Sequence, residues 1–391
     1  MCRTCENSQY LLTTRYARQE QFHMKEKVLV GMSGGVDSSV AAALLIEEGY
    51  DVAGITMKIW EGEPGGSAGR QGCYGAGELH DIGDARQVAS LLSIPFHIID
   101  LAKEYREHVL SYFKEEYSLG RTPNPCVRCN HKIKFGHLLG KAAETGLSFD
   151  YFATGHYVIK EFCEETGRHI LRKGADPRKD QSYFLSYLEQ GQLARSLFPL
   201  GKMRKDEVRA IAAKYSLPVV EKEESQDFIE DGNYAALFDS PPQPGPIVDL
   251  EGNELGTHKG IIHYTVGQRR RIGISAKEPL YVISIDSDRN TIVVGPAEHL
   301  FSRELTASNV NWISISSLGG PRRIKAKIRI AHRESDAMLI PAEAEDQVKV
   351  RFSEPQRGIT PGQIVVFYQN DKVLGGGIIK KSEQQRQRSG Q

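Results

Sequence analysis

The sequence predicts an α/β fold whose N-terminal half is a Rossmann-like parallel sheet, followed by a small central β-rich domain and a C-terminal β-barrel. Between residues 27 and 159, β-rich runs alternate with helical stretches, which is typical of βαβ units and of a parallel sheet covered on both faces. Beyond residue 222, short β-type runs are separated by turn residues, a pattern typical of small β domains and barrels. The chain of 391 residues is long enough for two or three domains.

The elements of the N-terminal half follow one another in a regular order. Strands are predicted at 27–32, 51–60, 95–101 and 151–159, and helices at 40–50, 84–93 and 134–146. The strand segments are rich in Val, Ile and aromatic residues, whereas the helical segments are rich in Ala and Leu. Ligands of such folds bind at the carboxyl ends of the strands, so we expect a binding site at that edge.

Composition divides the chain into five segments. A Pro- and Gly-rich stretch at 240–256 lies near the point where the alternating strand and helix patterns give way to short β-type runs. Both ends of the chain are polar and lack periodicity. Met24 is an alternative start to Met1, because the ordered pattern begins directly after it. The predicted segments are a disordered extension at 1–23, a catalytic domain at 24–222, a central domain at 223–300, a barrel at 301–381 and a disordered tail at 382–391.

Charge and cysteine content exclude several classes of protein. Lys plus Arg equals Asp plus Glu at 50 each, and the six cysteines show no framework spacing, so a disulfide-stapled secreted protein is not expected. No apolar run reaches the roughly 18 residues of a membrane span, and we expect a cytoplasmic protein without a membrane partner. Basic clusters at 172–179, 268–273 and 321–329 are spread along the chain, as expected for a protein that binds an extended polyanion.

The segment SGGVDSS at 33–39 lies between the first strand and the first helix. Its two glycines allow the backbone to approach phosphate closely, and the helix N-terminus adds partial positive charge. Asp37 stands where the P-loop of kinase-type NTPases has lysine, and an acidic residue beside phosphates helps to hold Mg²⁺. The segment therefore predicts an ATP site, and it resembles the pyrophosphatase loop of enzymes that adenylate a substrate.

From GMSGGVDSSVAAALL onward the chain resembles the tRNA-specific 2-thiouridylases, which place sulfur on the wobble uridine (position 34) of tRNA. The resemblance covers about residues 24 to 380 and implies an adenine nucleotide α-hydrolase-like catalytic domain. The matching motifs occur in family order: TPNPCVRCN (122–130), ATGHY (153–157), KDQSYFL (179–185), FPLGKMRKDEVR (198–209), ESQDFIEDGNY (224–234), YTVGQRR (264–270) and TPGQ (360–363).

The resemblance also implies the site residues. Residues matching the family's ATP contacts are Gly31, Met32, Ser33, Gly34, Gly35, Val36, Asp37, Ser38, Met57 and Gly155. Residues matching its tRNA or target-base contacts are Asn124, Pro125, Cys126, His156, Lys179, Asp180, Gln181, Arg329, Ile330 and Gln363. The family commonly has Arg-Tyr where this chain has Arg329-Ile330, so a stacking contact there is in doubt.

The implied reaction uses ATP and Mg²⁺ to adenylate O2 of the uracil, after which a persulfide sulfur attacks C2 and AMP leaves. Its partners are tRNA and a protein that donates persulfide sulfur, either a cysteine desulfurase or a relay carrier. The attacking sulfur needs a depressed pKa. We expect Arg121, Arg128, His131, Lys132 and Lys134 to stabilise a thiolate in the cysteine loop.

The cysteines depart from the family pattern, in which one lies in the T-P-N-P loop and a second in an S-Q-x-I-C-F-type segment. Cys129 matches the first, but ESQDFIEDGNY contains no cysteine, and Cys126 occupies a position where other members have aspartate. Three alternatives follow. Cys126 and Cys129 act as the catalytic pair, or they bind a [4Fe–4S] cluster with Cys73 as third ligand, or the protein is no longer a sulfurtransferase.

Two other functions stay open at this point. One is a tRNA-binding pyrophosphatase-loop protein without sulfurtransferase activity, which the missing cysteine favours. The other is a related adenylating ligase, which would need neither thiols nor tRNA. The intact SGGVDSS loop argues against the first, and the cysteine loop together with the predicted barrel argues against the second.

Overall fold

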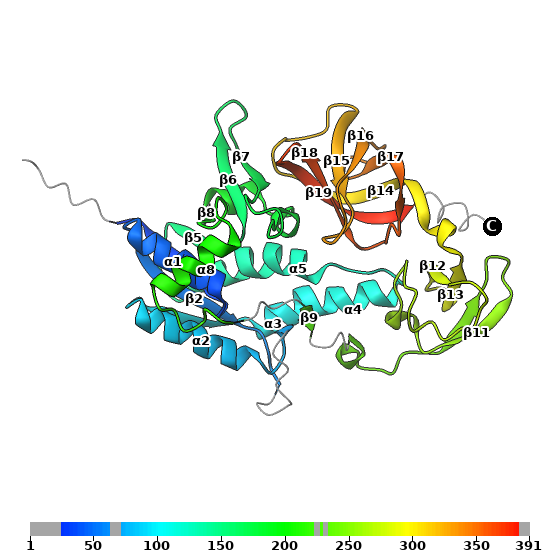
Figure 1. Ribbon diagram of the computed structural model, residues 1–391, viewed down its shortest axis with the longest axis horizontal. Coiled ribbons are helices and arrows are strands. Elements are labelled where there is room, and N and C mark those ends of the chain that lie inside the picture. The colour runs from blue at the N-terminus through cyan, green and yellow to red at the C-terminus, as the bar shows by residue number, and fades with distance from the viewer. Residues whose placement is uncertain (1–24, 63–71, 223–226, 230–233, 383–391) are drawn as a thin grey trace, which may run out of the picture.

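The computed structural model describes residues 25–62, 72–222, 227–229 and 234–382 (Figure 1). The extensions expected at 1–23 and, apart from Ser382, at 382–391 lie outside these residues. Much of the ESQDFIEDGNY segment also lies outside them, although Asp227–Ile229 forms a strand. The described chain has the predicted class: a parallel α/β domain, a small β-rich domain and a barrel, so the fold prediction is confirmed.

The N-terminal sheet is parallel throughout and has the strand order β4-β2-β1-β5-β8. Gly31, the last residue of β1, is in register with Ile55 of β2 and with Thr154 of β5. The carboxyl ends of the three central strands therefore meet at one edge. The strands are β1 Lys27–Gly31, β2 Asp51–Lys58, β4 Phe96–Asp100, β5 Tyr151–Thr154 and β8 Ser196–Leu197.

Helices cover both faces of this sheet because side chains alternate along β1. Val28 and Val30 pack with residues of α1, α2 and α8, whereas Leu29 packs with the helices between residues 102 and 144. No helix in the described residues is long and apolar enough to cross a membrane. The α-helices are α1 Val36–Glu47, α2 Glu78–Leu91, α3 Ala102–Tyr105, α4 Ser111–Ser118, α5 Pro125–Arg128, α6 Leu138–Glu144, α7 Gln190–Ala194 and α8 Lys205–Lys214.

Two π-helical stretches and several short 3-10 turns complete the helical part. The π-helices interrupt the run of helices that carries the cysteine loop, and π-helical turns occur frequently at functional sites. They are η1 Arg106–Leu110 and η2 Cys129–His137; the 3-10 turns are η3 Ser182–Leu185, η5 Tyr234–Leu237, η6 Ile261–His263 and η7 Ala297–Leu300.

The prediction of one strand at 151–159 was wrong. The chain forms β5 in the parallel sheet, leaves it at Gly155, and starts a new strand, β6 Val158–Cys163, in a different sheet. The reason is the close approach of Gly155 to the glycine loop, where a Cβ atom would lie 2.7 Å from the backbone of Asp37 and Ser38. Continuous β composition could not reveal this break.

The C-terminal half contains two further sheets. The central sheet has the order β11-β10-β13-β12, and the barrel closes through pairing of β14 with β19. The central strands are β10 Gly245–Val248, β11 Glu254–His258, β12 Tyr281–Asp286 and β13 Thr291–Gly295; the barrel strands are β14 Phe301–Trp312, β15 Arg322–Lys327, β16 Ser335–Pro341, β17 Val348–Arg357, β18 Ile364–Gln369 and β19 Lys372–Ser382.

A hairpin of the catalytic domain extends the sheet of the barrel. It consists of β6 and β7 Arg168–Lys173, and β7 pairs with β19. Arg172 also binds Asp371 through an ion pair of 2.8 Å. The two domains are thus joined by backbone hydrogen bonds as well as by side chains, and Figure 1 shows the hairpin beside the barrel.

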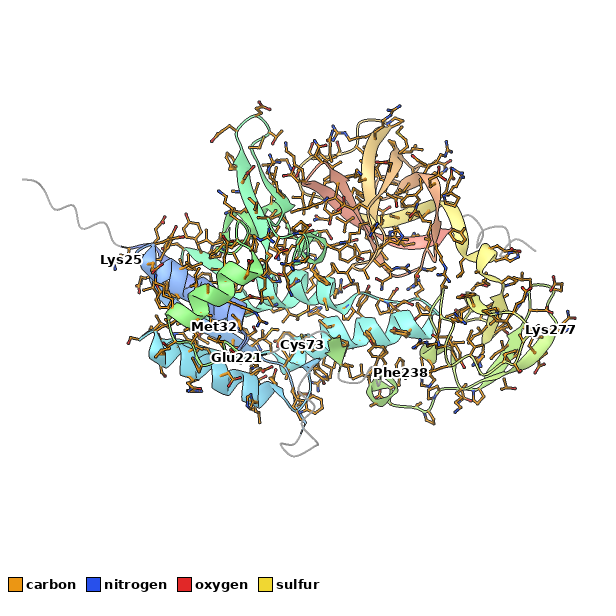
Figure 2. The ribbon with its side chains drawn as sticks, viewed as in Figure 1. Lys25, Met32, Cys73, Glu221, Phe238 and Lys277 are labelled. Atoms are coloured by element: carbon orange, nitrogen blue, oxygen red, sulfur yellow. The ribbon has the colours of Figure 1, made fainter. Side chains whose placement is uncertain are left out.

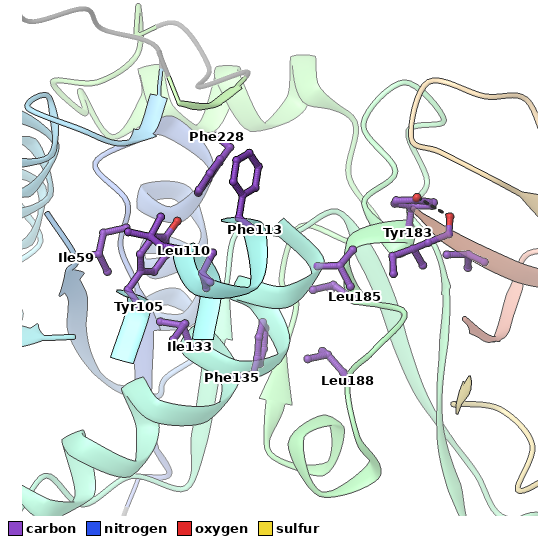
Figure 3. Packing of buried hydrophobic residues seen from close by; sticks show 14 of the residues in the cluster. Ile59, Tyr105, Leu110, Phe113, Ile133, Phe135, Tyr183, Leu185, Leu188 and Phe228 are labelled. Atoms are coloured by element: carbon purple, nitrogen blue, oxygen red, sulfur yellow. Dashed lines mark hydrogen bonds between the residues drawn. The ribbon is translucent and has the colours of Figure 1, made fainter. Parts of the chain in front are cut away.

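One hydrophobic cluster runs through all three parts of the chain. It contains Tyr105 and Ile133 of the catalytic domain, Val282 of the central sheet, and Val366 and Tyr368 of the barrel. Figure 3 shows Tyr105, Phe113 and Phe228 at one end of the close-up and Tyr183, Leu185 and Leu188 toward the other. The parts therefore share a core at the place where the cysteine loop crosses between them.

We predict that Phe152→Ala lowers the free energy of unfolding by about 3–5 kcal/mol, the usual cost of removing a buried phenyl ring. Phe152 is fully buried in β5 and its ring packs edge-on against Phe135. Urea denaturation measures the effect. Phe162→Ala, at a side chain that is 50 % exposed, is the control and should change stability by less than about 0.5 kcal/mol; equal losses would contradict this account of the core.

Candidate active site

The glycine loop between β1 and α1 forms a cradle for an anion. Gly34 has φ +72°, and a Cβ there would lie 2.2 Å from the carbonyl oxygen of Asp81, so only glycine fits. Ser33 N–H donates to Ser38 Oγ at 3.2 Å, and Ser38 Oγ donates to the Gly35 carbonyl at 3.2 Å. Helix α1 begins at Val36, so the unpaired N–H groups of its first turn face the loop.

Asp37 is held by two partners from distant parts of the chain. Its Oδ1 accepts hydrogen bonds from Lys205 Nζ and from Tyr157 Oη, both at 2.7 Å. Lys205 is buried at the start of α8. The cation beside Asp37 in this structure is therefore a lysine. The sequence analysis missed Lys205 as a site residue, although it lies in the quoted FPLGKMRKDEVR motif.

Gly155 and Met57 lie at the same edge of the sheet as the glycine loop. Gly155 follows β5 and touches the backbone of Asp37 and Ser38 so closely that a side chain would displace it. Met57 is half-buried near the end of β2, the strand next to β1. All residues expected to bind ATP are thus brought to the carboxyl edge, as the sequence analysis predicted for a ligand site.

The two cysteines of the TPNPCVRCN motif lie on consecutive helical turns. Cys126 belongs to α5 and Cys129 begins η2, so their spacing places them on one face of the helix. Asn124 caps α5 because its Oδ1 accepts from Val127 N–H at 3.0 Å, and Pro125 occupies the first helical position. The two sulfurs are thiols and do not form a disulfide.

Cys73 approaches the same site on a short strand. This strand, β3 Gly72–Tyr74, pairs in parallel with β9 Asp227–Ile229, with Gly72 opposite Asp227 and Tyr74 opposite Ile229. Cys73 is therefore carried beside the segment in which the family places its second cysteine. In the view of Figure 2, Cys73 lies between Met32 next to the glycine loop and Phe238 of the central part.

Buried Tyr105 lies within electrostatic reach of all three thiols. Burial raises the pKa of Tyr105 well above its usual value, and a thiolate at Cys129, Cys73 or Cys126 would raise it further. The Tyr105 ring stacks on Tyr74, with ring centres 5.4 Å apart, and lies beside Phe228 of β9. The structure thus places Cys73, which is distant in sequence, within reach of the same tyrosine as Cys126 and Cys129.

The expectation that surrounding cations stabilise a Cys129 thiolate is wrong for this state of the protein. Burial raises the pKa of Cys129 to about 11, and Lys134 opposes this shift without overcoming it. Most of the other expected cations have partners elsewhere. Arg121 binds Glu116, Arg128 donates to the His108 carbonyl, and His131 binds Glu189.

Two residues of the expected tRNA triplet have structural partners. Asp180 accepts hydrogen bonds from Gly174 N–H and from both the N–H and the hydroxyl of Ser182. Gln181 accepts from Tyr157 N–H at 2.9 Å. Their side chains therefore shape the turn that leads to η3, while Lys179 carries the positive charge of the triplet.

The other expected tRNA residues lie in three places. His156 bonds Thr154 Oγ1, and burial holds the pKa of His156 well below its usual value, so this ring is neutral. Arg329 is half-buried and Ile330 is 40 % exposed on the barrel. Gln363 donates through Nε2 to the carbonyls of Thr122 and Pro123. It therefore contacts the cysteine loop itself.

A group of potential metal ligands lies near the glycine loop. Within the described ranges, His80, Asp81 and Asp84 form the one set of three ligand atoms within 4.8 Å of one another. Lys222 binds both carboxylates, at 2.7 Å and 2.5 Å. The Lys222 cation thus already pairs with both carboxylates, and it ties α2 to the end of the catalytic domain.

Comparison with known proteins identifies relatives along nearly the whole chain. Models of the tRNA methyl transferase HUP domain, its PRC-barrel domain and the aminomethyltransferase β-barrel domain match residues 26–231, 239–296 and 302–379. The tRNA-specific 2-thiouridylase MnmA 2 of Thermoanaerobacter sp. (strain X514) is 49 % identical over 92 % of this chain and 99 % of its own. The tRNA-specific 2-thiouridylase MnmA of Acetivibrio thermocellus is 46 % identical over 91 % of this chain and 99 % of its own.

Likeness to solved structures is weak. A 4-thiouridine synthetase–RNA complex with bound ATP is 19 % identical, with a TM-score of 0.32, covering 52 % of this chain and 44 % of that one. This likeness carries no argument about the site.

We predict that Gly155→Ala weakens ATP binding by about ten-fold or more, equivalent to about 1.4 kcal/mol. The added methyl group would collide with the backbone of Asp37 and Ser38 and push the cradle out of shape. Equilibrium dialysis with ATP measures the change. Gly191→Ala, in α7 where a Cβ meets nothing within 4 Å, is the control and should bind ATP as the wild type does. Unchanged affinity in both variants would exclude this role for Gly155.

We predict that Cys129 reacts slowly with iodoacetamide at pH 7 and about ten times faster with each added pH unit until the pH approaches 11. The sign follows because only the thiolate reacts and burial raises the pKa of Cys129 to about 11. Mass spectrometry of the Cys129 peptide measures the rate. A rate that reaches a plateau below pH 8 would show that the thiol is activated in the resting protein.

Proposed function

The chain belongs to the tRNA-specific 2-thiouridylase family, and from this premise we propose that it catalyses ATP-dependent 2-thiolation of the wobble uridine of tRNA, releasing AMP and pyrophosphate. The observation that carries the proposal is the combination of a glycine loop shaped as an anion cradle at the sheet edge with the thiols of Cys126 and Cys129 on one helical run. A binding-only protein or an adenylating ligase has no use for both features.

In the first step the cradle binds ATP and O2 of the uracil attacks the α phosphorus, so that pyrophosphate leaves. The residues assigned to ATP are 31–38, Met57 and Gly155. Lys205 stabilises the negative charge that develops on the phosphates, because its ion pair with Asp37 holds it at the loop. Magnesium is part of the proposal as the partner of the triphosphate, and Asp37 is its candidate protein ligand.

In the second step a persulfide on Cys129 attacks C2 with its terminal sulfur, and AMP leaves with the bonding electrons of the C2–O2 bond. The thiolate of Cys126 then attacks the Cys129 sulfur. This breaks the S–S bond, leaves sulfur on C2, and closes a Cys126–Cys129 disulfide that an external thiol reduces before the next turnover. Helical spacing on one face makes the two thiols suitable partners.

An iron–sulfur cluster is a second candidate for this site, and the position of Cys73 favours it. Three thiols within electrostatic reach of Tyr105 match the ligand number of a [4Fe–4S] cluster with one open iron. Cys73, Cys126 and Cys129 would hold it, and when bound it would supply an iron that carries the transferred sulfur. Cys126 and Cys129 are partly buried, whereas Cys73 is exposed.

The tRNA is proposed to lie across the catalytic domain and the barrel. The stretch 124–126 faces the target base; Lys179 supplies charge for phosphate, while Asp180 and Gln181 hold its turn in place. His156, Arg329 and Ile330 complete the proposed surface, with the neutral His156 acting as a hydrogen-bonding or stacking group. The amide of Gln363 is engaged with the cysteine loop and supports that loop from the barrel. The sulfur comes from a persulfide-carrying protein, and the protein acts in the cytoplasm, where tRNA is modified.

We predict that Cys129→Ser lowers formation of 2-thiouridine at least a hundred-fold while tRNA binding stays within about two-fold, because serine cannot carry a persulfide. The assay combines anaerobically purified protein, unmodified tRNA, ATP, Mg²⁺ and a persulfide donor, with nucleosides measured by mass spectrometry. Cys163→Ser is the matched control, since Cys163 lies at the end of β6 and away from the Tyr105 group.

The same assay separates the two schemes for sulfur. Activity without iron that is lost in Cys126→Ser and kept in Cys73→Ser supports the thiol pair. Dependence on iron, with loss in all three variants, supports the cluster. Activity that survives Cys129→Ser would contradict both schemes, and pyrophosphate release without any sulfur transfer would favour the binding or ligase alternatives.

A further inference from the structure

A turn of the barrel grips the cysteine loop of the catalytic domain. Thr122 N–H donates to the Pro361 carbonyl at 2.8 Å, and Gln363 Nε2 donates to the carbonyls of Thr122 and Pro123, both at 3.0 Å. We call these three hydrogen bonds the clasp. We propose that Gln363 is a positioning residue for sulfur transfer, which holds the TPNPC loop, and through it the thiol helix, in the reactive position.

The barrel side of the clasp is rigid and shaped for this loop. Gly362 N–H donates to the Ile379 carbonyl, and Ile379 N–H donates to the Gln363 carbonyl, both at 2.8 Å, so the turn is fixed to β19. Gly362 has φ +88°, and a Cβ there would lie 2.9 Å from Thr122 N and O. The turn thus approaches the loop as closely as a glycine allows.

The loop side of the clasp offers only acceptors to the glutamine. Pro123 has no N–H, and the carbonyls of Thr122 and Pro123 precede the first helical position, so α5 supplies them with no partner. A glutamine amide brings two N–H donors on one nitrogen, which matches two adjacent carbonyls. A residue without these donors leaves both carbonyls short of their partner.

The clasp is connected directly to the thiols. Asn124 follows the gripped residues and caps α5 through Val127 N–H, and Cys126 lies in that helix. Pro123 and Pro125 each fix one φ angle. A displacement of Thr122 or Pro123 is therefore transmitted along the backbone to α5. A small displacement of a reacting group strongly slows a positioned reaction, and the clasp therefore controls the sulfur step.

A third domain contacts the same point. Thr122 Oγ1 lies 3.2 Å from Thr265 Oγ1 of the central domain. Beside the clasp, the buried Tyr183 hydroxyl donates to the Ile364 carbonyl at 2.8 Å. The loop is thus held where the three domains meet, and the barrel contributes to the reaction by orienting the loop in addition to any contact with RNA.

The kinetic part of this inference rests on the proposed function, so its test has an arm that needs no activity. The variants are Gln363→Ala and Gln363→Met, the second of which keeps the volume of the side chain without its donors. Gln369→Ala, at the exposed end of the adjacent strand β18, is the matched control. Circular dichroism checks folding, and Gln363→Met serves if the alanine variant does not fold.

In the first arm, N-ethylmaleimide labels the partly buried Cys126, and mass spectrometry follows the rate. We expect labelling to accelerate at least five-fold in the Gln363 variants, because the released loop exposes α5, and to stay unchanged in Gln369→Ala. Unchanged labelling in Gln363→Met would overturn the clasp, whether or not the wild-type protein makes 2-thiouridine.

In the second arm, single-turnover formation of 2-thiouridine should fall at least ten-fold in the Gln363 variants, whereas the tRNA dissociation constant and its salt dependence stay within two-fold. The opposite division, with weaker tRNA binding and an unchanged single-turnover rate at saturating tRNA, would assign Gln363 to direct RNA contact and overturn its positioning role. Absence of product in the wild type would contradict the proposed function alone.

Discussion

Burial of the cysteine helix in a core shared by three domains is the constraint on which the site depends. Ile133, four residues after Cys129, is fully buried in a cluster that also contains Val282 of the central sheet and Val366 of the barrel. This placement partly shields Cys129 from water, and it disfavours the thiolate. The raised pKa of Cys129 is the direct consequence of this burial.

The glycine loop is ordered by its own hydrogen bonds before any nucleotide binds. Its serines bond to its own backbone, and Asp37 is held by Lys205 and Tyr157. These contacts preorganise the cradle, which lowers the cost of ordering it around a nucleotide. Gly155 and Gly34 permit this packing because any side chain at either position would meet backbone atoms. A loop that is rich in glycine and serine by sequence is thus a well-ordered element in the fold.

The thiols illustrate how a short strand pairing can change the interpretation of a sequence. Read along the chain, the segment around Phe228 has lost the family's cysteine. In space, β3 lies beside β9 and carries Cys73 to this segment. Cys73 therefore lies beside the segment that lacks the family's second cysteine, and it acts electrostatically on the same tyrosine as Cys126 and Cys129.

Much of the fold and of the site could be predicted from the sequence, because both depend on local patterns. Alternation of strands and helices determined the parallel sheet, and SGGVDSS determined the cradle at its edge, since glycine conformation and helix ends act over a few residues. The break of the predicted strand at Gly155, the ion pair of Asp37 with Lys205, the grip of Gln363 on the cysteine loop and the protonation of Cys129 were decided by tertiary structure alone. Each of these arises from contact between residues distant in sequence, and burial and close approach are properties of the packed chain that no local pattern records.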